Sequence, residues 1–360
     1  KEIKVHESRV AITPDGVSEL VRAGHDVFIE TGAGLGSAIT DADFIAHGAK
    51  ILATADEVWS AAELILKVKE PIEVEYSRIK ANHTLFTYLH LAASKPCTDA
   101  LIASGCAAIA YETVEKDGQL PLLLPMSEVA GRMATPVGAY SLQKPNGGRG
   151  VLLAGVPGVA PGKVVVIGGG VAGLNAAVIA MGMGADVTVL DRSISRMQEV
   201  DSLYGGRIKT LFSAHASIER EVLQADLVIG AVLVHGAKAP KLVSNELVSR
   251  MKHGSVLVDI AIDQGGCFED SKPTTHAEPT FKVHNSIFYC VANMPGAVPV
   301  ASTYALTNAT MPYTLALANF GWQNAIVKDP ALAKGLNISG GKVRYQAVAQ
   351  AHAYEFSPIG

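Results

Sequence analysis

The chain lacks the features that mark several large classes of protein. Its 30 lysines and arginines are outnumbered by 34 aspartates and glutamates, so it offers no basic field for a phosphate backbone, and no aromatic and basic RNA-binding module appears. Its four cysteines show no C-x-x-C spacing, which argues against a zinc knuckle and a disulfide framework. We therefore expect reduced thiols, no metal site and no nucleic-acid partner.

Three familiar catalytic patterns are missing as well. The sequence contains no Walker lysine motif, no H-E-x-x-H and no G-x-S-x-G. Phosphoryl transfer, zinc-dependent hydrolysis and nucleophile-elbow chemistry are therefore without support. No signal peptide is visible, although the chain begins at Lys1 rather than at a methionine, and we expect a cytoplasmic protein.

The chain is long for a single hydrophobic core, because 360 residues usually divide into two domains. Short apolar runs alternate with amphipathic stretches from the start, and this alternation predicts an α/β fold with parallel sheets. Thr13 can cap a helix that begins at Pro14, and Thr40 can open another. Early strands are expected at Val27–Glu30, Leu64–Val68 and Leu85–Leu91.

A long helix over Pro125–Gln143 separates this region from a second one, and we place the first domain boundary near Leu124. Five strands follow, with helices between the first four. They are expected at Val164–Ile167, Asp186–Leu190, Ile208–Leu211, Leu227–Ile229 and Ser255–Ile260. Glycine and proline become frequent around Asn293–Val300, where the chain leaves the second domain, and Val298–Phe320 predicts a helical return.

One stretch raises a choice between a membrane helix and a nucleotide site. No charged residue occurs between Lys163 and Asp186, and the run is long enough to cross a bilayer. However, three glycines, Gly168 to Gly170, directly follow a β-branched run, and this is the pattern of a strand that meets a turn. We therefore expect a dinucleotide fold rather than a membrane span.

Each glycine of the pattern G-x-G-x-x-G has a physical task in that fold. Gly168 makes the tight turn, Gly170 lets backbone N–H groups approach the pyrophosphate, and Gly173 lets the helix lie close to the strand. Asp191 follows the next strand, where a carboxylate would bind the ribose hydroxyls and repel a 2′-phosphate. Strand, glycines, helix, strand and acid in this order predict an NAD site.

A nicotinamide enzyme with a small polar substrate also needs a cation, a proton acceptor and a dry pocket. Candidates are ionisable residues in apolar stretches, and parallel strand ends are favoured places for them. They are Arg9, Lys67, Lys69, His90, Asp259 and Asp263. A histidine in an apolar strand is more often a core residue, and an arginine near a terminus is usually solvated, so spacing alone assigns no roles.

Five sequence blocks carry a resemblance to the L-alanine dehydrogenase family. They occur in the family's order and span nearly the whole chain. The blocks are Ser8–Pro14, Leu66–Pro71, Leu89–Ala93, Pro125–Arg132 and Val258–Cys267. The chain departs from the family mainly at its start, where a short strand expected before Lys1 is absent.

The resemblance implies reversible oxidative deamination of L-alanine to pyruvate and ammonium, with NAD as cofactor and a homohexameric assembly. It implies two Rossmann-like doubly wound domains, with an NAD domain (125–298) inserted into a discontinuous substrate domain (1–124 and 299–360). Arg9 and Lys69 would bind the substrate carboxylate and carbonyl oxygen, His90 would be the general acid/base, and Asp263 would assist near the nicotinamide. Further cofactor contacts would be Ser127, Val171, Asp191, Arg196, Ser213, Val232, Leu233, Ile260, Asn293 and Met294.

Two alternatives remain open at this point. The nucleotide-binding subunit of proton-translocating transhydrogenase shares the two-domain plan and the glycine pattern, but the blocks with His90 and Ser127 favour the dehydrogenase. A catalytically silent NAD-binding sensor would lack the candidate acid/base residues, which are present in this chain.

Overall fold

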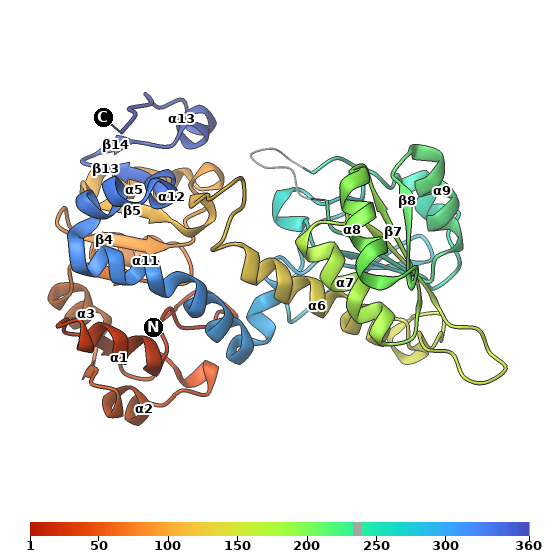
Figure 1. Cartoon of the computed structure of the whole chain (residues 1–360), viewed down its shortest axis with the longest axis horizontal. Helices are drawn as coiled ribbons and strands as arrows, with labels where there is room; N and C mark the ends of the chain where they lie inside the picture. Colours follow the sequence, from red (N-terminus) through yellow and green to blue (C-terminus); the bar gives the residue numbers. More distant parts are fainter. Residues whose placement is uncertain (233–238, 360) are drawn as a thin grey trace. The chain divides into compact units, whose positions relative to one another are not determined.

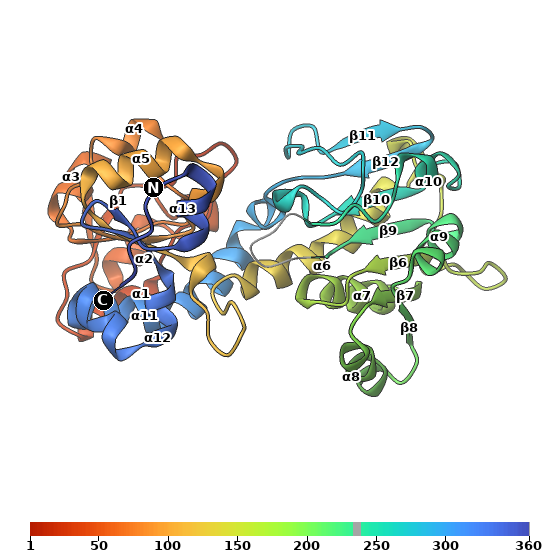
Figure 2. The ribbon, with the colours of Figure 1, turned by 90° about the horizontal axis from the view of Figure 1, so that it is seen from above.

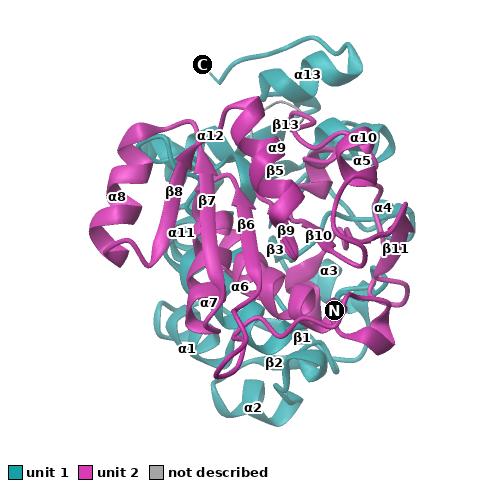
Figure 3. Ribbon diagram, turned by 90° about the vertical axis from the view of Figure 1, so that its right-hand side faces the viewer, with its two compact units in different colours: residues 1–126, 298–360 teal, residues 127–297 magenta. Residues whose placement is uncertain are grey.

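A computed structural model describes residues 1–232 and 239–359 of the chain. The chain divides into two compact units (Figure 3). Unit 1 comprises Lys1–Met126 and Val298–Gly360, and unit 2 comprises Ser127–Ala297. Each unit contains mainly parallel sheet with helices packed on it, so the expected α/β fold class is confirmed. Within the described residues, no helix is both long enough and apolar enough to cross a membrane.

Unit 2 is built on a seven-stranded sheet with the order β11-β12-β10-β9-β6-β7-β8, which can be followed from edge to edge in Figure 2. All neighbours are parallel except β11 and β12. Because β7 and β9 lie on opposite sides of β6, the strand order reverses there, which is where such sheets bind ligands. The strands are β6 (Lys163–Ile167), β7 (Asp186–Asp191), β8 (Ile208–Phe212), β9 (Leu227–Gly230), β10 (Val256–Asp259), β11 (Thr280–Val283) and β12 (Ser286–Tyr289).

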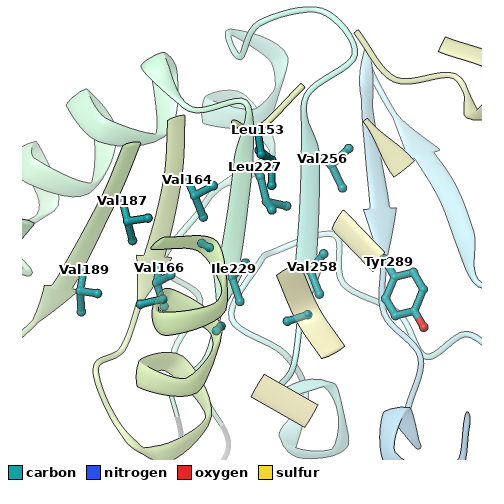
Figure 4. Packing of buried hydrophobic residues seen from close by; sticks show 14 of the residues in the cluster. Leu153, Val164, Val166, Val187, Val189, Leu227, Ile229, Val256, Val258 and Tyr289 are labelled. Carbon is teal, nitrogen blue, oxygen red and sulfur yellow. The ribbon is translucent and has the colours of Figure 1, made fainter. Parts of the chain in front are cut away.

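Both faces of this sheet are buried. Valine and isoleucine side chains of the central strands project to one face (Figure 4), where they pack against alanines of α6 and α7. The other face packs against α9 and α10. Burial on both faces explains the near-continuous apolar strands. The helices are α6 (Leu124–Ser141), α7 (Val171–Gly182), α8 (Ile194–Tyr204), α9 (His215–Gln224) and α10 (Asn245–Ser249).

Unit 1 contains a five-stranded sheet with the order β14-β13-β5-β4-β3 and a separate pair, β1-β2. Strands β14, β13, β5 and β4 can be seen in Figure 1. Strands β3, β4 and β5 are parallel neighbours, and β13 runs antiparallel to β5. The strands of this unit therefore form two separate sheets rather than one continuous doubly wound sheet. The strands are β1 (Phe28–Glu30), β2 (Lys50–Leu52), β3 (Leu64–Leu66), β4 (Thr84–Thr87), β5 (Ala107–Ala110), β13 (Leu336–Ser339) and β14 (Lys342–Val343).

The helices of unit 1 begin where capping chemistry places them. The side chain of Thr13 accepts a hydrogen bond from the Gly16 N–H at the start of α1, and Thr40 and Asp43 form a capping box at α2. The helices are α1 (Pro14–Arg22), α2 (Asp41–Ala46), α3 (Ala55–Ala61), α4 (Glu73–Tyr76), α5 (Lys95–Ser104), α11 (Pro299–Lys328), α12 (Pro330–Gly335) and α13 (Gln346–His352).

Several element boundaries differ from the sequence predictions. The helical return ends at Phe320 as predicted, because Gly321 is non-helical (φ 70°), and a second helical stretch within the same label α11 continues to Lys328. Strands β3 and β4 end two and four residues earlier than predicted. Alanine-rich β5 escaped prediction because alanine is depleted in strands, and the hairpin of β11 and β12 was not predicted either.

Candidate active site and nucleotide-binding turn

The turn after β6, residues Gly168–Gly173, has the geometry that a pyrophosphate cradle needs. Gly168 has φ +101°, a conformation that disfavours side chains, and its N–H donates to the Leu190 carbonyl (2.8 Å). A Cβ on Gly173 would lie 1.8 Å from the carbonyl oxygen of Gly168, so only glycine allows this approach of α7. Nothing lies within 4 Å of a Cβ position at Gly170, so the start of α7 is open.

Two charged side chains hold this turn. Asp191, the last residue of β7, accepts hydrogen bonds from the N–H groups of Gly169 (2.6 Å) and Ser193 (2.7 Å). Arg196 of α8 donates from Nε to the carbonyl oxygen of Gly169 (2.6 Å). Residue 169 is therefore fixed at both of its backbone polar groups, and the predicted ribose carboxylate also has a structural task.

The remaining predicted cofactor residues follow the strands at the same edge of the sheet. Ser213 follows β8, Val232 follows β9, and Ile260 follows β10, where its N–H donates to the Gly230 carbonyl (2.9 Å). Asn293 and Met294 follow β12, Val171 is the first residue of α7, and Ser127 lies in the first turn of α6. Leu233 lies outside the described residues. We call this set, with the glycine turn, the unit 2 edge.

The acid that ends β10 and the acid in the loop after it have different surroundings. Asp259 is fully buried and accepts hydrogen bonds from the N–H groups of Ala261 (3.1 Å) and Cys267 (2.8 Å) and from the Ser271 hydroxyl. Burial raises its pKa, while these donors oppose the shift. Asp263 is exposed in the short 3₁₀ helix of the same loop. Asp259 therefore shapes the loop that presents Asp263 and is removed from the candidate catalytic residues.

In unit 1, three polar side chains follow three adjacent parallel strands. Lys69 lies three residues after β3, His90 three residues after β4, and Glu112 two residues after β5. Backbone pairing of the first two strands continues to the Tyr88 N–H, which donates to the Val68 carbonyl (3.3 Å). We call Lys69, His90 and Glu112 the unit 1 edge.

His90 does not lie in a strand, contrary to the sequence prediction. Strand β4 ends at Thr87, and His90 has φ +48°, a left-handed conformation that is uncommon for a residue with a side chain. The carboxylate of Glu112 accepts the His90 N–H (2.6 Å) and the Leu89 N–H (3.1 Å) and lies 3.8 Å from His90 Nδ1. The ring stacks parallel to Tyr88 and is 40% exposed, so it is no core histidine.

The two candidate lysines differ in burial and in ion pairing. Lys67 is buried, and its Nζ lies 3.1 Å from Glu2 Oε2 and 3.0 Å from Glu75 Oε1. Burial opposes its charge, but the two carboxylates outweigh this effect and raise the pKa of Lys67. Lys67 is therefore a structural cation. Lys69 is half-buried, and among the described residues no carboxylate forms an ion pair with it.

Arg9 is buried, so the solvated position that is usual for an arginine near a terminus does not apply to it. Its guanidinium meets Glu7 twice, with Nε 2.7 Å from Oε1 and Nη2 2.5 Å from Oε2, and Nη1 donates to Met126 Sδ (3.0 Å). Burial raises the pKa of Tyr88, and the Arg9 cation opposes this shift.

Sequence reasoning missed Glu7 and Glu112. The signal for Glu112 is the same as for the other strand-end residues, because it follows the buried run Cys106–Tyr111, but the alanine-rich strand had not been recognised. Glu7 carries no comparable signal, since only the fold brings its carboxylate onto Arg9.

In the described part of the chain, the cysteines are buried and no cluster of metal ligands is present. Cys97, Cys106, Cys267 and Cys290 are free and buried. Burial raises the pKa of Cys97, Cys267 and Cys290 to about 12. Within residues 1–232 and 239–359, no group of three or more histidine, cysteine, aspartate or glutamate side chains could hold a metal ion.

Comparison with known proteins gives strong similarities along the chain. The alanine dehydrogenase of Mycolicibacterium smegmatis is 67% identical over 350 residues, which cover 97% of this chain and 94% of that protein. A solved L-alanine dehydrogenase structure superimposes with a TM-score of 0.95 and 50% identity, covering 98% of both chains. A transhydrogenase from Sinorhizobium meliloti superimposes with a TM-score of 0.82 and 26% identity, covering 96% of this chain and 98% of that one.

Two family models divide the chain between them. The alanine dehydrogenase/PNT N-terminal domain matches residues 1–130, and the alanine dehydrogenase/PNT C-terminal domain matches residues 134–346. The five sequence blocks had indicated this relationship, and it is confirmed. By its two domain matches and its similarity to the mycobacterial enzyme, the chain belongs to the alanine dehydrogenase/PNT family.

Proposed function

We propose that this protein is an L-alanine dehydrogenase that uses NAD. The reaction converts L-alanine, water and NAD⁺ into pyruvate, ammonium, NADH and a proton, and it is reversible. Unit 2 is the NAD domain, and unit 1 is the substrate domain. The resemblance to the family also supports a cytoplasmic homohexamer as part of this proposal.

The observation that carries the proposal is that a cationic side chain and a proton-transferring side chain occur together at the unit 1 edge. A lysine without an ion-pair partner among the described residues and a half-exposed histidine follow neighbouring strands, and the same unit contains a buried arginine. A carboxylate substrate needs such cations, and amine oxidation needs a group that moves protons. The sequence identity of 67% to an alanine dehydrogenase supports the same substrate.

The residues of this edge would have distinct roles. Arg9 and Lys69 bind the substrate carboxylate and the oxygen of pyruvate, and a lysine there stabilises negative charge that develops on that oxygen. His90 takes the proton that alanine loses from its ammonium group and then activates water. Histidine suits this task because it both accepts and releases protons near neutral pH. Asp263, in unit 2, would assist near the nicotinamide.

The unit 2 edge fits a dinucleotide. The open start of α7, the close approach at Gly173 and the carboxylate of Asp191 match the tasks of pyrophosphate and ribose binding. When bound, NAD supplies the hydride acceptor. The residues that would hold it are Ser127, Gly168, Gly170, Val171, Gly173, Asp191, Arg196, Ser213, Val232, Leu233, Ile260, Asp263, Asn293 and Met294.

The direct test is NADH formation by the purified protein across amino acids. We expect L-alanine to be oxidised far better than D-alanine, valine or glutamate. For glutamate the reason is that the candidate site offers one set of cations for one carboxylate. Equal rates with glutamate would contradict the proposed substrate. The absence of NADH formation with any amino acid would contradict the proposed reaction.

The alternative activity is that of a transhydrogenase subunit, and the fold similarity to the Sinorhizobium meliloti transhydrogenase supports it. The lower identity, 26% against 67%, favours the dehydrogenase. The two activities differ in their requirements, because a dehydrogenase turns over alone. Strict dependence of turnover on a membrane fraction would favour the transhydrogenase.

A further inference from the structure

The turn that follows β6 is held by charged side chains of both signs. The N–H of Gly169 donates to Asp191, and its carbonyl accepts from Arg196, at 2.6 Å in each case. A Cβ on residue 169 would lie 3.2 Å from Asp191 Oδ2 and 3.6 Å from Arg196 Cγ. Arg196 therefore lies beside the carboxylate that is proposed to bind the adenosine ribose.

A second acid neutralises this arginine. Nη1 of Arg196 lies 2.5 Å from Oε2 of Glu199, one turn further along α8. The two side chains are 25% and 51% exposed, and a pair as exposed as this contributes little to stability. Its main consequence is electrostatic, because it cancels a positive charge next to Asp191.

Two arginines and two acids thus lie along the short stretch from the end of β7 into α8. Arg192 is exposed directly after Asp191, and Arg196 follows one turn later. In dinucleotide folds an arginine at this place accommodates the 2′-phosphate of NADP, whereas an acid repels it. The chain therefore carries the cations for a 2′-phosphate, and both acids act against that use.

We propose that Glu199 is a specificity-determining residue that holds Arg196 away from the 2′-phosphate of NADP. This inference rests on the proposed binding of a nicotinamide dinucleotide by unit 2. A 2′-phosphate carries about −1.5 to −2 charges at neutral pH, so a second carboxylate near it adds repulsion to that of Asp191. By pairing with Nη1, Glu199 also occupies a donor that the phosphate would need.

The test compares dissociation constants for NADH and NADPH, measured through nicotinamide fluorescence or by competition. Glu199→Gln removes the charge and keeps the side-chain length. We expect it to tighten NADPH binding by about three- to tenfold, as is reasonable for a half-exposed charge, and to change NADH binding less. The matched control is Glu246→Gln, which removes the same charge from another helical pair of unit 2, with Arg250 (3.0 Å).

A further variant identifies the receptor of the phosphate. Adding Arg196→Gln to Glu199→Gln should abolish the gain in NADPH affinity. An equal gain in the Glu246→Gln control would overturn the proposal, because the effect would then be one of net charge. A gain that persists without Arg196 would overturn it as well. These measurements need no turnover of alanine, so a protein that fails to oxidise alanine would contradict the proposed function and still test Glu199.

Discussion

The unit 2 edge and the unit 1 edge are built in opposite ways. The unit 2 edge depends on the backbone, and its central part is one continuous stretch from β6 to Asp191. The unit 1 edge depends on side chains that follow three separate strands, with Arg9 added from the start of the chain. A local pattern therefore reveals the nucleotide site, whereas only the sheet topology brings the proposed catalytic residues together.

The two units also differ in how their charges are surrounded. In unit 1, Arg9 and Lys67 form ion pairs that are almost fully buried. In unit 2, the pair of Arg196 and Glu199 is partly exposed. Removing one partner of a buried pair leaves an uncompensated charge in the interior, so changes to the buried charges in unit 1 should cost more stability.

The largest effect is expected where the backbone itself is crowded. Gly173→Ala places a Cβ 1.8 Å from the Gly168 carbonyl oxygen, so α7 must move, and we expect a loss of about 3 kcal/mol in stability together with NADH binding. Gly182→Ala in the same helix is the control, since nothing lies within 4 Å of its Cβ position. Thermal unfolding and NADH titration of both variants check this, and normal NADH binding by Gly173→Ala would contradict it.

The next effect concerns the support of His90. Glu112→Ala removes the acceptor of the Leu89 and His90 N–H groups, so His90 should leave its left-handed conformation and kcat should fall about 10²-fold. Glu112→Gln keeps one acceptor oxygen and should restore part of the rate. Glu115→Ala, three residues along, is the control. NADH affinity should be unchanged in all three, and an equal loss of rate in the control would disprove the support role.

A smaller effect is expected for the choice of cofactor. Asp191→Ala should lower the ratio of kcat/KM for NAD over NADP about 10- to 100-fold, because it removes a charged hydrogen-bond acceptor for the ribose. Asp191→Asn should lower the same ratio but keep more NADH affinity, since its amide oxygen can still accept the Gly169 N–H. If neither variant changed the ratio, Asp191 would act on the turn alone.

The smallest effect is expected in the rate of cysteine labelling, which compares the stability of the two units. Burial and a pKa of about 12 for Cys97, Cys267 and Cys290 should keep these thiols unreactive toward an alkylating reagent in the native protein at pH 8. In mild denaturant, NADH at 100 times its Kd should stabilise unit 2 by about 2.7 kcal/mol. Labelling of Cys267 and Cys290 should then slow more than labelling of Cys97, as mass spectrometry would show. Equal slowing would mean that the units unfold together.

The sequence alone predicted most of unit 2 and less of unit 1. The succession of strand, glycine turn, helix, strand and Asp191 could be predicted, because glycine spacing, β-branched runs and the acid are local signals in the sequence. His90 was placed in a strand because Tyr88 to Leu91 is apolar around it, and sequence does not reveal the left-handed turn that Glu112 stabilises. Lys67 and Lys69 occupy equivalent alternating positions in the sequence. Only the fold distinguishes them, because it places Glu2 and Glu75 against Lys67.

One measurement tests the division of labour between the two edges most directly. On a single preparation of His90→Ala, kcat for alanine oxidation, NADH affinity and melting temperature are determined together. We predict a fall of kcat by about 10²- to 10⁴-fold with nearly normal NADH affinity and melting temperature, since His90 is half-exposed and would move protons without binding the nucleotide. Near-normal turnover would remove His90 from the mechanism, leave Asp263 as the principal acid/base candidate, and contradict the account.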